Sequence, residues 1–198
     1  MTSHDRIDAL ARLFIAAGHG PVAVLDDALN AASRSASDAD IEETLLLLVP
    51  YAGVPRALVA FGVWRKRRAT PAAPVIGRPD PDGRRGTDAF AEVYGSSSEG
   101  VSALLRTLHP DLEAAAIQDA YGRTLARPSF PWVDRELLAT AFLAALGAAP
   151  QCAAHARAAL RHGADGACIG RMVDLGLGDN PDDVGVRHAV AAALRARR

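Results

Sequence analysis

The 198-residue chain carries 22 basic and 23 acidic side chains, for a net charge of −1. Its 21 arginines are scattered along the chain, which argues against a phosphate-binding surface and so against a nucleic-acid partner. The N-terminus lacks the basic head and apolar run of a signal peptide, and no apolar stretch reaches the roughly 18 residues that a membrane helix needs. Two cysteines cannot build a disulfide framework. We therefore expect a cytoplasmic protein with no membrane partner.

The composition favours an all-α fold. Alanine accounts for 42 residues, and aromatic residues for only 5% of a chain that is 49% hydrophobic. Alanine has the highest helix propensity, whereas strands are rich in β-branched and aromatic residues. No segment shows the alternating pattern of a half-buried strand.

Helices are expected first in the N-terminal third of the chain. Apolar spacing, glycine and proline positions and a start signal at Ser37 predict helices over residues 7–17, 21–30, 37–49 and 55–67. The segment 69–87 then mixes proline, glycine and arginine with no apolar period, so we interpret it as a linker. Beyond it, the same signals predict helices over 87–94, 98–108, 110–125, 133–146, 151–162, 166–175 and 182–197.

The clearest pattern lies in the hairpin predicted over residues 133–162. Arg135-Glu136-Leu137-Leu138 is followed by a small-residue helix ending at Gly147, then by His155 and Ala159-Leu160. This order resembles the carboxymuconolactone decarboxylase and AhpD superfamily. A second, weaker match runs from Ala28 to Tyr51-Ala52-Gly53-Val54-Pro55. The resemblance implies an AhpD-like helical bundle of two tandem repeats: a degenerate one over 1–68, the linker 69–87, and a second over 88–198 with the Glu/His motif.

The thiol peroxidases of this superfamily use the pattern E-x11-C-x2-C-x3-H. Counted from Glu136, the two cysteine places fall on Ala148 and Gln151 and the histidine on His155, so both cysteines are missing. Cys152 lies one residue beyond the second place, about 100° around a helix. A single reactive thiol at Cys152, with its pKa lowered by His155, remains an alternative that would give an antioxidant, peroxidase-like protein. A buried, inert cysteine is the other interpretation.

The decarboxylase branch lacks these cysteines and moves protons on a lactone acid. The resemblance therefore implies catalysis by Glu136 and His155, with a carboxylate orienting an imidazole that works near neutral pH. For the substrate's acid group, Arg123, Arg135 or Arg56 could form a bidentate clamp. A hairpin turning at Ala148 would place Glu136 and His155 about 7 Å apart along the helix axes, so their contact would need a bend.

Other interpretations stay open. Glu136 could simply complement its helix dipole, His155 could be a core histidine, and Tyr51 could either line a pocket or cap a helix junction. A catalytically silent helical oligomer is a further alternative. We expect no metal site and no cofactor, because the one Cys/His stripe belongs to a single helix. The leading hypothesis is a decarboxylase-like lyase acting on a small organic acid or lactone. It is expected to form a homo-oligomer (dimer, trimer or hexamer).

Overall fold

A computed structural model describes residues 3–68, 84–128, 130–178 and 183–195, and within these ranges the chain forms helices and turns without a strand. The all-α fold is confirmed. The chain divides into two compact units: Met1–Ala72 with Phe130–Arg198, and Ala73–Ser129. No helix in the described ranges is long and apolar enough to cross a membrane.

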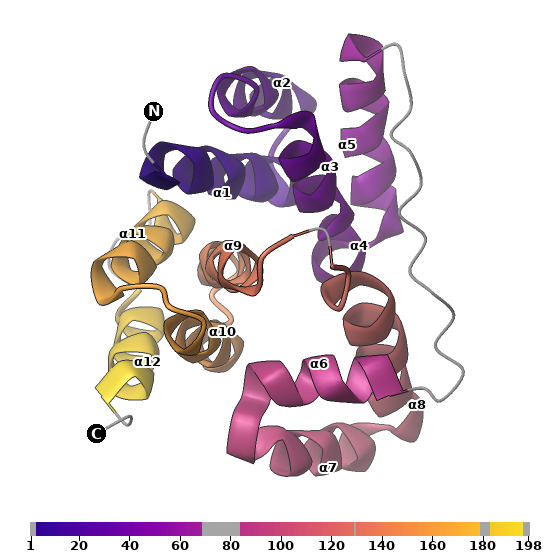
Figure 1. The fold of residues 1–198 in the computed structure, drawn as a ribbon, viewed down its shortest axis with the longest axis vertical. Helices are drawn as coiled ribbons and strands as arrows, with labels where there is room; N and C mark the ends of the chain where they lie inside the picture. The colour runs from indigo at the N-terminus through magenta and orange to yellow at the C-terminus, as the bar shows by residue number, and fades with distance from the viewer. Residues whose placement is uncertain (1–2, 69–83, 129, 179–182, 196–198) are drawn as a thin grey trace. The chain divides into compact units, whose positions relative to one another are not determined.

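The larger unit is built around one central helix, α9 (Trp132–Ala145), seen between its neighbours in Figure 1. All ten residues from Arg135 to Ala144 are buried, so α9 contacts protein on every side. The helices packed against it are α1 (Ser3–His19), α10 (Ala149–Arg161) and α11 (Gly166–Leu177). The unit is completed by α2 (Val22–Ala32), α3 (Asp38–Leu46), α4 (Leu48–Ala52), α5 (Val54–Arg67) and α12 (Val184–Arg195).

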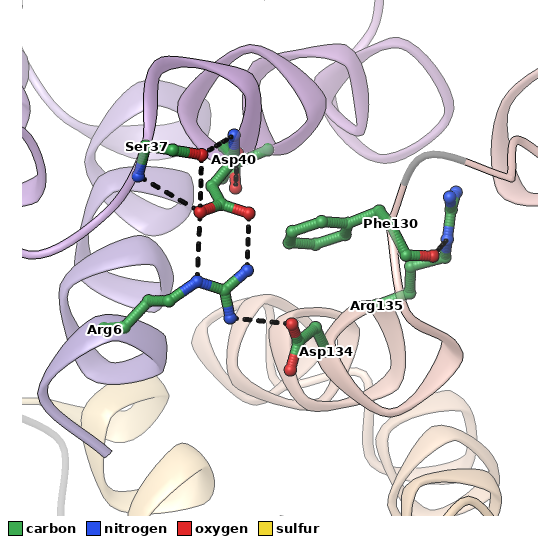
Figure 2. A network of polar contacts seen from close by, with 7 residues as sticks. Arg6, Ser37, Asp40, Phe130, Asp134 and Arg135 are labelled. Carbon is green, nitrogen blue, oxygen red and sulfur yellow. Dashed lines mark hydrogen bonds and ion pairs between the residues drawn. The ribbon is translucent and has the colours of Figure 1, made fainter. Parts of the chain in front are cut away.

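Arg6 connects three helices of this unit (Figure 2). Its guanidinium donates to both carboxylate oxygens of Asp40 at 3.1 and 2.5 Å, and to Asp134 at 2.8 Å. Asp40 also completes the capping box that begins α3, where the Ser37 side chain accepts from the Asp40 N–H. The start signal at Ser37 is thereby confirmed. The bidentate contact with Arg6 lowers the pKa of Asp40 below its usual range.

The smaller unit contains α6 (Arg84–Tyr94), the short 3-10 helix η1 (Gly95–Ser97), α7 (Ser98–Leu108) and α8 (Pro110–Ala114). The helix predicted over 110–125 changes at Ala115 into the π-helix η2 (Ala115–Leu125). Close packing of α6 on η2 depends on Gly86, because a Cβ there would lie 2.1 Å from the Ile117 carbonyl oxygen. Phe90 and Tyr121 meet edge to face in the core of this unit.

The predicted repeats and the compact units have different boundaries. The larger unit joins the N-terminal third of the chain to its C-terminal part, and the smaller unit takes residues from the predicted linker and second repeat. Residues 69–83 of that linker lie outside the described ranges, and residues 84–87 begin α6. The tandem duplication stays a prediction.

Candidate active site

Glu136 and His155 are in direct contact inside the larger unit. The Nδ1 atom of His155 lies 2.7 Å from Oε2 of Glu136. The glutamate comes from the first half of α9 and is fully buried, and the histidine comes from the middle of α10 and is 4% exposed. The sequence pattern therefore identified two residues, 19 positions apart, that form a buried carboxylate–imidazole pair.

The two side chains meet although the sequence argument expected an offset of about 7 Å along the helix axes, and the register of the hairpin explains why. A second contact, from the Cys152 thiol to the Thr140 carbonyl oxygen at 3.4 Å, pairs α9 with α10 in the same register. In sequence, the midpoint of each contacting pair falls near Leu146, whereas the sequence argument placed the turn at Ala148. Since α9 ends at Ala145 and α10 begins at Ala149, the offset along the helix axes falls to about three residues, roughly 4.5 Å, which the two side chains span.

Tyr51 extends the pair on its other side. Its hydroxyl lies 3.5 Å from Nε2 of His155, so the imidazole is placed between a carboxylate and a phenol. Tyr51 belongs to α4, a five-residue helix that ends at Gly53, whose φ of 84° is unfavourable for other residues. The N-terminal part of the chain thus contributes a group 104 positions away in sequence.

Three further rings hold the aromatic side of this site. The Tyr51 ring meets Phe14 and Phe142 edge to face at centroid distances of 5.6 and 5.8 Å. Phe142 in turn lies 4.4 Å from Phe14 and is stacked on His19 at 4.6 Å. Gly18 makes this arrangement possible, because a Cβ at that position would lie 2.2 Å from the Phe142 ring.

The geometry assigns different work to the two imidazole nitrogens. A carboxylate is an acceptor, so Nδ1 donates its proton to Glu136 and the neutral ring keeps Nε2 free of a proton. Nε2 is then the nitrogen that can accept or release a proton in a reaction. The other oxygen of the buried carboxylate, Oε1, has no hydrogen-bond partner among the described residues. This oxygen can still accept a proton, or a hydrogen bond from a bound molecule.

Cys152 does not have the properties of a reactive thiol. It is fully buried, and this burial raises its pKa to about 12. A thiolate is the nucleophilic form of cysteine, and it is scarce at neutral pH for such a group. The alternative in which His155 lowers this pKa is therefore contradicted, and the structure favours the inert interpretation of Cys152. Burial also raises the pKa of Cys168.

The three arginines considered as substrate clamps have other surroundings. Arg135 is 1% exposed, donates to the Phe130 carbonyl oxygen at 3.1 Å, and faces the rings of Phe130 and Trp132. Arg56 donates to carbonyl oxygens at the C-terminal end of α1, including Ala17 at 2.8 Å. Arg123 is exposed in the smaller unit and pairs with Asp119 on its own helix. Arg135 and Arg56 thus serve packing and helix capping.

Sequence reasoning did not associate the aromatic side of the site with the Glu/His pair. Phe14 and Phe142 lie within the predicted helices 7–17 and 133–146 as apolar residues, which indicates a place in the core and no more, and His19 lies beyond the first of these helices. Burial of His19, aided by the nearby Arg56 charge, lowers its pKa and favours a neutral ring stacked on Phe142. The signal that could have drawn attention to this region was Gly18, the residue after the predicted end of the first helix, because α1 in fact continues to His19. Within the described residues, no cluster of three His, Cys, Asp or Glu side chains could hold a metal ion.

Comparison with known families agrees with this picture. Residues 112–174, about a third of the chain, match the model of the Carboxymuconolactone decarboxylase family. Over this segment the chain is similar to the Carboxymuconolactone decarboxylase family. The matched segment includes α9 and α10, and therefore both members of the buried pair, so the resemblance inferred from the sequence is confirmed. A search of curated proteins gave no match to this chain.

Proposed function

We propose that this protein is a decarboxylase-like lyase in which Glu136 and His155 transfer a proton on a small organic acid or lactone. The observation that supports the proposal is the 2.7 Å contact between Nδ1 of His155 and Oε2 of Glu136. A base held by a buried third group is the arrangement that acid–base and nucleophilic catalysis share. A histidine kept only for packing would not need an ionisable partner in a fully buried place.

The proposed reaction removes carbon dioxide from the substrate. The carbon–carboxylate bond breaks, its electron pair stays on the carbon as an enolate, and a proton from the His155 side of the site is then added to that carbon. His155 enters this step as an imidazolium whose Nδ1–H donates to Glu136, and leaves it neutral with the same hydrogen bond. Glu136 stabilises the charged ring and fixes its orientation, and water later restores the proton to His155.

The test uses carboxymuconolactone as the probe and carbon dioxide release as the signal. His155→Gln and Glu136→Gln should each lower kcat at least about 100-fold, the usual contribution of a positioned acid or base. His188→Gln is the matched control, since His188 is an exposed residue of α12 and is absent from the site. If His155→Gln releases carbon dioxide at the rate of the unmodified protein, the proposed chemistry is refuted.

A further inference from the structure

We infer that Tyr51 is a further catalytic residue, which exchanges the proton with the substrate while His155 acts through it. The inference rests on the proposed function and deepens it, because it names the reacting group and limits the class of substrate. The observation that carries it is the juxtaposition of Oη of Tyr51 with Nε2 of His155 at 3.5 Å, on the opposite side of the ring from Glu136.

Accessibility is the first argument. Glu136 is fully buried and His155 is 4% exposed, so the imidazole presents little surface to a substrate. Tyr51 is only half-buried, and its hydroxyl lies beside the one imidazole nitrogen that Glu136 does not occupy. Tyr51 therefore offers more surface to a substrate than the imidazole does. The 3.5 Å separation is long for a hydrogen bond, as is common at catalytic contacts before a substrate binds.

The second argument is that contacts of its ring position Tyr51 beside His155. Edge-to-face contacts with Phe14 and Phe142 hold its ring, and Gly53 caps α4 two residues after it. These contacts involve the ring and leave the hydroxyl beside Nε2 of His155. A phenylalanine would satisfy the same packing, so packing does not account for the oxygen.

The proton balance of the relay is simple. The Oη–H bond of Tyr51 breaks as its proton forms a bond to the substrate carbon, and the Nε2–H bond of the imidazolium breaks as that proton moves to Oη. Tyr51 ends the step as a neutral phenol, His155 as a neutral imidazole, and Glu136 as a carboxylate. One proton has passed from Nε2 to carbon, and no oxidant or reductant takes part.

A phenol as the donor also limits the substrate class. Phenols ordinarily ionise near pH 10 and imidazoles near 6.5, so Tyr51 is suited to a strongly basic acceptor. An enolate carbon left by loss of carbon dioxide is such an acceptor, whereas a weakly basic leaving group would be matched better by the imidazolium itself. We therefore expect a substrate whose carboxylate lies beside a carbonyl or lactone that can hold the negative charge.

The kinetic test compares Tyr51→Phe with the intact protein, using carbon dioxide release from carboxymuconolactone. The relay predicts a fall in kcat of about 100-fold with KM changed less than about twofold, because the variant keeps the ring and loses only the proton donor. Tyr94→Phe is the matched control: it removes the hydroxyl of a half-buried tyrosine in the smaller unit and should leave both constants unchanged. Full activity of Tyr51→Phe alongside an inactive His155→Gln overturns the relay but leaves the proposed function standing. Full activity of His155→Gln overturns the proposed function itself.

A second readout does not depend on turnover. In protein labelled with ¹⁵N-histidine, Tyr51→Phe should shift the Nε2 resonance of His155 and leave Nδ1 with the signature of an N–H donating to Glu136. Tyr94→Phe should move neither resonance. An unchanged Nε2 resonance in Tyr51→Phe overturns the relay, whether or not carboxymuconolactone is turned over.

Discussion

Substituting Gly18 by alanine tests the packing that supports the site. The added Cβ would lie 2.2 Å from Cε2 and 2.5 Å from Cζ of Phe142. Ordinary contact begins near 3.4 Å, so the ring edge must move by about 1.2 Å. Phe142 is fully buried and contacts Phe14, His19 and Tyr51, so it cannot move without displacing them.

Two opposing effects determine how far Gly18→Ala changes the free energy of unfolding. Replacing glycine by alanine inside a helix gains about 1 kcal/mol, from helix propensity. Overpacking a filled core costs about 1–3 kcal/mol, and a displacement of this size in a fully buried ring belongs at the upper end. The net expectation for Gly18→Ala is a loss of about 1–2 kcal/mol in the free energy of unfolding.

Urea unfolding followed by tryptophan fluorescence is the appropriate assay, since Trp64 and Trp132, the two tryptophans of the chain, both belong to the larger unit. The control is Gly62→Ala on α5, where no atom lies within 4 Å of the added Cβ, so stability should rise by about 0.5–1 kcal/mol. The midpoints of the two variants should therefore shift in opposite directions. If Gly18→Ala is stabilised as much as Gly62→Ala, the packing argument is refuted.

Three further predictions concern charge, thiol reactivity and the smaller unit. Asp40→Asn should cost about 1–2 kcal/mol at pH 7 by weakening the Arg6 contact. The contact with Arg6 lowers the pKa of Asp40 in the folded state. The stability that the contact gives to the fold is therefore complete above the ordinary pKa of 3.8, and it is lost as the pH falls through the lowered pKa. Urea unfolding of the intact protein and of Asp40→Asn, at pH 7 and again below the lowered pKa of Asp40, should show their free energies of unfolding converging in acid. A difference that stays constant between the two pH values would contradict this. Cys152, with a pKa raised to about 12 and no exposed surface, should not react with Ellman's reagent at pH 8 until urea unfolds the protein; labelling of that residue in the folded state would contradict its burial. Gly86→Ala should destabilise the smaller unit by about 1–3 kcal/mol, because the new Cβ meets the Ile117 backbone. Faster amide hydrogen exchange in α6 and η2 would show this, and unchanged exchange would count against it.

The sequence predicted the helices well because their boundaries depend on local chemistry. Ser37 begins α3 through a capping box, as its hydroxyl and the following carboxylates indicated, and α7 has the predicted bounds Ser98–Leu108. The change to a π-helix at Ala115 was not predicted, because the same apolar spacing is compatible with an ordinary helix.

The site was only half predictable. The spacing of Glu136 and His155 identified the pair, yet the register that brings them together depends on where α9 ends. Tyr51 was a candidate for lining a pocket, but its position beside His155 depends on packing across 104 residues, which no local pattern encodes. Arg135 shows the opposite error: it adjoins Glu136 in sequence, but neighbours on a helix point about 100° apart, and its guanidinium packs on Phe130 instead.

The complete burial of α9 has a consequence for the dynamics of the site. Its amides from Arg135 to Ala144 should exchange with solvent only when the whole unit opens, because no face of the helix can be exposed by a local fluctuation. Tyr51 lies on a helix of five residues, a length that frays readily without its neighbours. Glu136 thus lies in a segment that we expect to exchange slowly, whereas Tyr51 lies in a short helix that we expect to open more readily. Motion that admits a molecule to the imidazole should therefore begin at α4.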